Sequence, residues 1–147
     1  MLTVVEKVIF LQAVDVFSEV PTEQLAFLGA VAEELSAAEG ETLYRTDEPS
    51  DCMYLVLEGE VRLHRGEIQV TVARAREAFG TWALFDDEPR LTSATCVRAS
   101  RLLRVDKDDF IEVLADNVQI TQGVLKAVVR RLRALGRAVA QPTPSQG

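Results

Sequence analysis

The sequence contains few of the residues that build metal, disulfide or catalytic centres. It has one histidine, His64, and two cysteines, Cys52 and Cys96, each within an apolar run typical of a strand. Two cysteines are too few for a disulfide framework and no Cys/His cluster is present, so we expect buried free thiols and no zinc site. No Ser/His/Asp set or Cys/His pair is evident, which argues against an enzyme and indicates no cofactor.

Long apolar runs are also missing. No stretch of 18 apolar residues occurs, which excludes a membrane-spanning helix, and the first residues, MLTVVEKVIF, lack the basic leader and cleavage site of a signal peptide. These absences predict a cytoplasmic protein, and a segment cut from a larger protein would give the same pattern. The 147 residues, 48% of them hydrophobic, fit one domain over residues 1–140 with its own core.

The charge is acidic overall but unevenly spread. The net charge of −7 argues against broad nucleic-acid binding. From residue 123 onward, however, there are five basic residues and no acidic ones: Lys126, Arg130, Arg131, Arg133 and Arg137. We interpret this basic stripe as a solvated helix face, favoured by cations near a helix C-terminus, rather than as a nucleic-acid surface.

The hydrophobic periodicity divides the chain into helical, strand and helical parts. Residues 3–35 follow the helical period, with Thr22 as a predicted N-cap of a second helix that runs through Leu35 and stops before Gly40. Residues 36–106 contain short apolar runs separated by turn residues, which predict strands at 41–45, 52–57, 61–64, 68–73, 92–97 and 102–105. Residues 107–139 are helical again, with a break at 116–117, and the composition of residues 141–147 is typical of a disordered tail.

The predicted fold is therefore mainly β with flanking helices, a jelly-roll-like β-roll of about eight strands. The aromatic residues Phe17, Phe27, Phe85 and Phe110 are expected to pack in the core or between helices, and Tyr44 and Tyr54 within the sheets.

Residues 79–95 are the strongest candidate for a functional loop. Gly80 permits close approach of the backbone to a ligand, and the short apolar segment after it is compatible with one helical turn whose first amides suit a phosphate. Arg90 adds a side chain able to pair with phosphate oxygens through two hydrogen bonds. An ordinary strand connection, with Arg90 paired to Asp86, Asp87 or Glu88, explains the same residues, and the residues alone leave both interpretations open.

This stretch resembles the phosphate-binding cassette of the cyclic-nucleotide-binding domain family, which includes the catabolite activator protein and the protein kinase A regulatory subunit. The family pattern is Phe-Gly-Glu-x-Ala-Leu, a few turn residues, and then Pro-Arg. The chain has Phe-Gly-Thr-Trp-Ala-Leu at 79–84 and Pro-Arg at 89–90, with the spacing kept. The resemblance extends over roughly residues 11–135 and includes the strand pair and glycine of segment 51–61.

The resemblance implies a role for each residue of the cassette. Arg90 would hold the cyclic phosphate, helped by the amides of Ala83 and Leu91. Thr81 stands where the family has a Glu that accepts a hydrogen bond from the ribose 2′-hydroxyl, and loss of such a bond costs roughly 10- to 150-fold in affinity. Trp82, the only tryptophan, is expected to pack the loop against the core rather than to cover a ligand base. The complete set of expected ligand-binding residues is Gly80, Thr81, Trp82, Ala83, Arg90, Leu91 and Thr92.

Two functional hypotheses follow from the resemblance. In the first, the chain is a regulatory sensor module that binds cyclic AMP, cyclic GMP or a related phosphate ligand. Ligand binding would shift the C-terminal helix, residues 118–139, and pass a signal to an attached effector domain or a homodimer partner. In the second, the ligand site is lost and the fold serves as a docking or dimerisation module of a larger protein.

Overall fold

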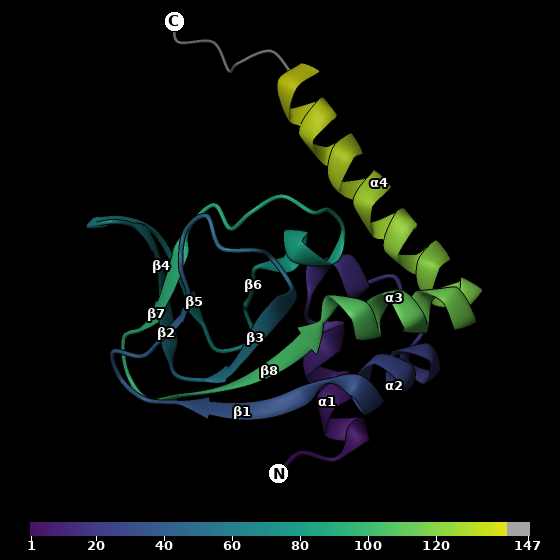
Figure 1. The fold of residues 1–147 in the computed structure, drawn as a ribbon. Coiled ribbons are helices and arrows are strands. Elements are labelled where there is room, and N and C mark those ends of the chain that lie inside the picture. The colour runs from purple at the N-terminus through teal and green to yellow at the C-terminus, as the bar shows by residue number, and fades with distance from the viewer. Residues whose placement is uncertain (141–147) are drawn as a thin grey trace, which may run out of the picture.

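The computed structural model describes residues 1–140, and the predicted disordered tail at 141–147 lies outside them. The described chain forms eight strands in two antiparallel sheets with helices at both ends, which confirms the predicted β-roll (Figure 1). The strands are β1 (Glu33–Ala37), β2 (Thr42–Tyr44), β3 (Cys52–Glu58), β4 (Glu60–Arg65), β5 (Ile68–Arg74), β6 (Ala78–Phe79), β7 (Ser93–Cys96) and β8 (Ser100–Asp106). The helices are α1 (Val4–Gln12), the 3₁₀ turn η1 (Asp15–Phe17), α2 (Thr22–Val31), the 3₁₀ turn η2 (Thr81–Leu84), α3 (Lys107–Asp116) and α4 (Val118–Ala140).

The two sheets form the walls of the roll. One sheet has the strand order β1-β8-β3-β6 and the other β2-β7-β4-β5. Strand β3 is buried at six consecutive positions, because one of its faces packs inside the roll and the other packs against the helices. The roll interior is filled by small and aromatic side chains, with Val56, Val61, Ala94 and Leu102 fully buried. The loop of interest leaves the roll at β6 and returns at β7.

The helices cover the outer face of the first sheet and form a second core with it. Phe17 and Phe110 lie at its centre, fully buried, with their ring centroids 6.1 Å apart. Helix α1 begins with a capping box, in which the Thr3 side chain accepts from the Glu6 amide and the Glu6 carboxylate accepts from the Thr3 amide. None of the helices within residues 1–140 is long and apolar enough to cross a membrane.

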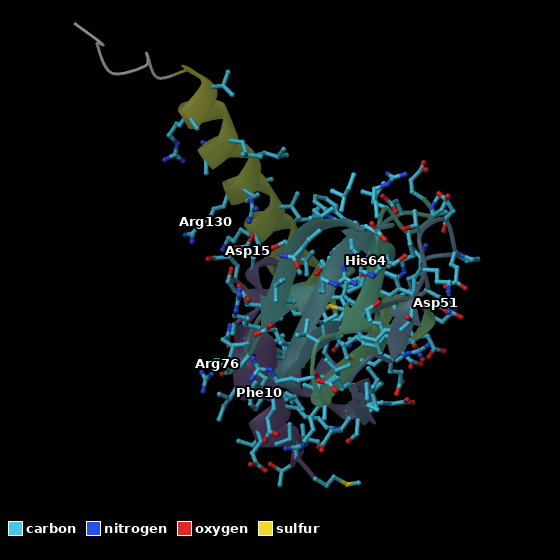
Figure 2. All side chains as sticks on the ribbon, turned by 90° about the vertical axis from the view of Figure 1, so that its left-hand side faces the viewer. Phe10, Asp15, Asp51, His64, Arg76 and Arg130 are labelled. Atoms are coloured by element: carbon cyan, nitrogen blue, oxygen red, sulfur yellow. The ribbon has the colours of Figure 1, made fainter. Side chains whose placement is uncertain are left out.

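The first half of α4 packs on the η1 turn, and the second half projects away from the rest of the molecule (Figure 1). Close packing is possible because position 123 is a glycine. Two ion pairs lie next to this contact, Arg130 to Glu19 at 2.6 Å and Arg131 to Asp15 at 2.7 Å, and Figure 2 shows the neighbouring segments. From its middle to its end, α4 exposes a row of apolar side chains with 3-4 spacing: Leu125, Val128, Leu132, Leu135 and Val139.

Several expectations about local structure were wrong. The second helix ends at Val31, not Leu35, and residues from Glu33 onward form the edge strand β1, in which Leu35 pairs with Leu102. The apolar spacing continues the helical period through Leu35 by coincidence, and pairing with β8 overrides it. Thr22 is the first helical residue and makes no capping bond to the backbone, and Pro21 precedes the helix.

The expectation of core or helix packing was confirmed for most aromatic residues, including Phe85, which is partly exposed but packs on a residue of α3, whereas Phe27 is half-exposed. Phe17, Phe110, Tyr44 and Tyr54 are buried. Phe27 is 50% exposed and Phe85 42% exposed. Phe85 still contacts the core with one edge, because its ring meets that of Phe110 at a centroid distance of 5.5 Å in an edge-to-face arrangement.

Candidate functional site

Gly80 sets the geometry at the start of the loop. It lies between β6 and η2 with φ of 71° and ψ of 17°, a left-handed backbone conformation that residues other than glycine rarely adopt. A Cβ atom at this position would lie 2.6 Å from Nη1 of Arg90. The two residues that the sequence motif places ten positions apart are therefore in direct contact, and the contact requires glycine.

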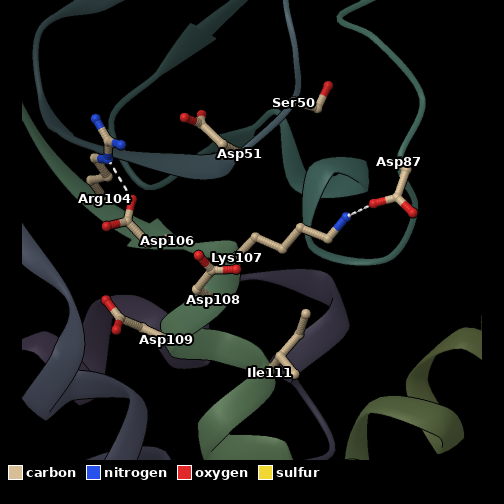
Figure 3. Close-up of a pocket in the computed structure, with 9 residues that line it drawn as sticks. All are labelled: Ser50, Asp51, Asp87, Arg104, Asp106, Lys107, Asp108, Asp109 and Ile111. Carbon is tan, nitrogen blue, oxygen red and sulfur yellow. Dashed lines mark hydrogen bonds and ion pairs between the residues drawn. The ribbon is translucent and has the colours of Figure 1, made fainter.

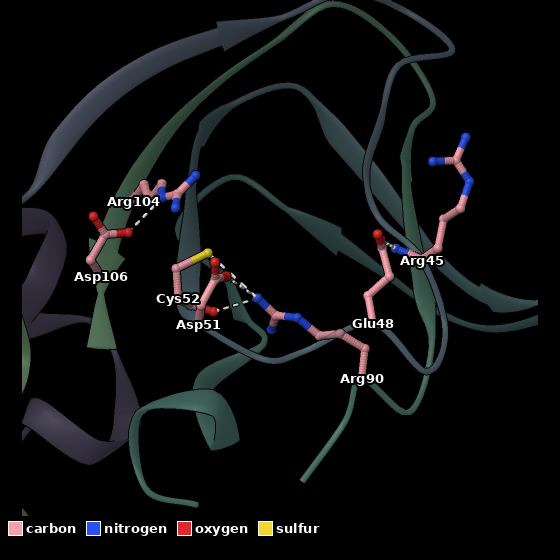
Figure 4. Close-up of polar contacts among 7 residues, drawn as sticks. All are labelled: Arg45, Glu48, Asp51, Cys52, Arg90, Arg104 and Asp106. Atoms are coloured by element: carbon pink, nitrogen blue, oxygen red, sulfur yellow. Dashed lines mark hydrogen bonds and ion pairs between the residues drawn. The ribbon is translucent and has the colours of Figure 1, made fainter. Parts of the chain in front are cut away.

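The Arg90 side chain turns inward and reaches the start of β3 (Figure 4). Its Nη2 donates to the carbonyl oxygen of Cys52 at 2.8 Å and lies 3.7 Å from Oδ1 of Asp51. The backbone of Arg90 is also held, because its amide donates to the Glu48 carbonyl and its carbonyl accepts from the Asp47 amide, both at 2.8 Å. The loop is thus attached through Arg90 to the turn between β2 and β3.

A cluster of stacked aromatic rings supports the guanidinium. Its Cζ lies 3.9 Å from the ring centroid of Tyr44, a distance that gives a cation–π contact. Tyr44 packs on Tyr54, and Tyr54 stacks on Phe79 with centroids 5.3 Å apart. Burial raises the pKa of Tyr44, opposed by the positive charge of Arg90, so the phenol is neutral at physiological pH.

The charge of Arg90 is only partly compensated. The arginine is 5% exposed, whereas its one acidic partner, Asp51, has a side chain that is 72% exposed. Its Nε is buried and has no hydrogen-bond partner among the described residues. Buried donors are normally satisfied, and a guanidinium with a donor to spare matches the geometry of a phosphate or carboxylate. Chemically, the arrangement is suited to receive an anion at Gly80 and Arg90.

The other expected ligand-binding residues lie around this pair in different environments. Thr81 and Thr92 are half-buried, and Ala83 is buried with its amide donating to the Gly80 carbonyl at 3.1 Å. Leu91 is 69% exposed. Trp82 is 75% exposed, so the expectation that it packs the loop on the core was wrong. The 3₁₀ turn directs Ala83 and Leu84 inward instead.

The alternative pairing of Arg90 with the acidic turn is also corrected. Asp87 pairs with Lys107 and Asp86 accepts from the Glu88 amide, whereas the acid nearest Arg90 is Asp51. Sequence reasoning missed Asp51, Cys52 and Tyr44 as neighbours of Arg90. Asp51 could have been suspected as a site residue because it is an acid directly before a buried strand. However, nothing in the local pattern indicates which strand end faces the loop.

Comparison with known proteins agrees with this geometry. Residues 34–117 match the family model described as "Cyclic nucleotide-binding domain". A CRP-like cAMP-activated global transcriptional regulator of Mycobacterium tuberculosis is 28% identical over 130 residues, which cover 85% of this chain and 58% of the regulator. The chain therefore spans a little over half the length of this relative.

Two solved structures are similar to this chain over most of its length. The N-terminal domain of a transcriptional regulator from Streptomyces coelicolor A3(2) is 32% identical with a TM-score of 0.78, and the match covers 90% of this chain and 95% of that domain. The regulatory domain of Toxoplasma gondii PKA, solved with cAMP, is 25% identical with a TM-score of 0.69 and is covered to 44%, against 74% of this chain. By their names, these relatives are regulators or regulatory domains.

Proposed function

Because this chain belongs to the cyclic nucleotide-binding domain family, we propose that it is a regulatory sensor module that binds a cyclic nucleotide through residues 79–95. Cyclic AMP is the first candidate, since the mycobacterial relative is named as cAMP-activated and the Toxoplasma regulatory domain was solved with cAMP. Cyclic GMP is the second, because it carries the same cyclic phosphate for Arg90.

One observation carries the proposal: a nearly fully buried arginine with an unpartnered Nε lies against a glycine that permits close approach. A purely structural arginine would be expected to have all its donors satisfied, because an unsatisfied buried donor costs about 1–3 kcal/mol. A cyclic phosphate held by Arg90 would supply the missing acceptors and compensate the charge. Asp51, which is exposed and 3.7 Å from Nη2, would compete with the ligand for the same group.

The expected affinity is modest. Thr81 stands where the family has a carboxylate for the ribose, and a half-buried hydroxyl is a weaker acceptor than a charged group. The phosphate contact at Arg90 would therefore provide most of the binding free energy.

Helix α4 is the proposed output element. Its exposed apolar side chains at 125, 128, 132, 135 and 139 follow the a/d pattern of a coiled coil. The positions beside this seam include Val129, Arg131, Gly136 and Ala138, and the charge among these four, that of Arg131, is paired with Asp15 of the same chain. The proposed partner is therefore a second copy of the chain or an attached effector domain, and the ligand must bind one position of α4 better than another to pass a signal.

The same exposed seam favours a second candidate function, a docking or dimerisation module without a ligand. Thermal unfolding with increasing cyclic AMP or cyclic GMP separates the two. For the sensor, ligand at 100 times Kd adds about 2.7 kcal/mol of stability. For a domain of this size, that corresponds to a rise in Tm of about 5–11 °C. An unchanged Tm, together with a ligand-independent dimer in sedimentation, would support the docking module and contradict the sensor.

A further inference from the structure

Lys107 links the candidate ligand loop to the helices that follow the roll. It is the first residue of α3 and comes directly after β8. Its Nζ donates to the carbonyl oxygen of Asp86 at 2.6 Å and to Oδ1 of Asp87 at 2.5 Å (Figure 3). Its backbone amide donates to the carbonyl of Asp51 at 2.9 Å. One residue is thus bonded to Asp51, which lies beside Arg90, and to the turn that precedes Arg90 in the sequence.

This contact differs from an ordinary surface ion pair. The Lys107 side chain is only 16% exposed, whereas the Asp87 side chain is 99% exposed, and Lys107 borders an open cleft of about 590 Å³ between the loop and α3. One of its two partners is a backbone carbonyl, which moves only if the loop itself moves. The Lys107 hydrogen bond and charge also lower the pKa of the Asp87 carboxyl, so this carboxyl is ionised at neutral pH. One turn further along α3, Phe110 meets Phe85 of the same loop.

We propose that Lys107 is a positioning residue that clamps residues 85–87 to the start of α3, so that the ligand loop and the C-terminal helices move as one unit. The clamp adds a positioning residue to the proposed sensor function. Only its expected effect on ligand binding rests on that proposed function. Asp51 shares the arrangement, because its carbonyl holds the Lys107 amide while its carboxylate faces Arg90. Displacement of Asp51 from Arg90 by a ligand would therefore act at a residue bonded to α3.

The clamp is tested first without ligand. The amides of Phe85 and Asp86 donate to the Trp82 carbonyl, at 3.0 and 3.2 Å, and their hydrogen exchange reports on opening of the loop. Lys107→Met is expected to speed their exchange about tenfold, the factor for net loss of one hydrogen bond to a charged group. Lys107→Arg is expected to restore most of the protection. Lys126→Met is the matched control, because Lys126 is exposed on α4.

The exchange pattern decides between clamping and general stability. The proposal is overturned if Lys107→Met exchanges at the wild-type rate, or if the acceleration is equal at the buried strand residue Leu103, which would indicate global destabilisation. With cyclic AMP as the probe, Lys107→Met is then expected to weaken binding about tenfold without abolishing it. Absence of binding of both cyclic AMP and cyclic GMP by the wild-type chain would contradict the proposed function, whereas the ligand-free exchange would still decide the clamp.

Discussion

Helix α4 packs through Gly123 on Glu19 and Val20, just after the η1 turn. The geometry of this contact predicts whether an alanine at position 123 stabilises or destabilises the fold. Gly123 lies inside α4, where alanine is favoured over glycine by about 1 kcal/mol. An added Cβ would lie 2.8 Å from Cγ2 and 2.9 Å from Cα of Val20, and 3.0 Å from the Glu19 carbonyl oxygen. Two of these three atoms belong to the backbone and cannot turn away. Overpacking of this kind costs about 1–3 kcal/mol.

We therefore expect Gly123→Ala to destabilise the fold by roughly 0–2 kcal/mol, because the packing cost exceeds the gain in helix propensity. Gly136→Ala is the matched control, since Gly136 lies in the same helix with no atom within 4 Å of the added Cβ. It is expected to increase helicity or stability by up to about 1 kcal/mol. Urea unfolding followed by far-ultraviolet circular dichroism and by Trp82 fluorescence measures both. If Gly123→Ala stabilised the chain as much as Gly136→Ala, α4 would not pack on Glu19 and Val20 as described.

Two further predictions concern the ribose position and acid stability. Thr81→Glu restores a charged acceptor in the loop and is expected to tighten cyclic AMP binding by roughly 10- to 150-fold, measured by calorimetry, and an unchanged Kd would argue against a ribose contact at this position. Glu34 has a pKa below its ordinary value because Arg101 and then the Leu2 amide donate to it. Its stabilising contribution is present above the unfolded-state pKa and lost as the pH falls through the lower folded-state pKa. Glu34→Gln is therefore expected to be less stable than wild type in urea at pH 7, with the difference shrinking near pH 3, and an equal difference at both pH values would contradict this.

The sequence predicted the roll because its strands carry their own local pattern. Six runs rich in apolar and β-branched residues, separated by turn residues, correspond to β2, β3, β4, β5, β7 and β8. Strand β1 was missed because Leu28, Val31 and Leu35 continue a helical spacing into a segment whose structure is decided by pairing with β8. Strand β6 has two residues, too few for any periodicity.

The sequence predicted the site residues that lie within one continuous motif, but not those that other strands bring to it. The spacing of Gly80 and Arg90 identified a pair that the structure brings into contact. The neighbours Asp51, Cys52 and Tyr44 come from β2 and β3, and only the closure of the roll places them under the loop. Trp82 was misjudged because a large apolar residue favours burial in general, whereas the 3₁₀ turn directs it to solvent.

Titration calorimetry with cyclic AMP tests the central claim, that Arg90 makes residues 79–95 a phosphate-binding loop. Arg90→Lys keeps the positive charge but loses the planar guanidinium, and Arg98→Lys, at an exposed ion pair with Glu60, is the matched control. We expect the wild-type chain and Arg98→Lys to bind cyclic AMP, and Arg90→Lys to lose at least about tenfold in affinity. No heat from the wild-type chain at high-micromolar cyclic AMP and cyclic GMP, or equal affinity in Arg90→Lys, would contradict it.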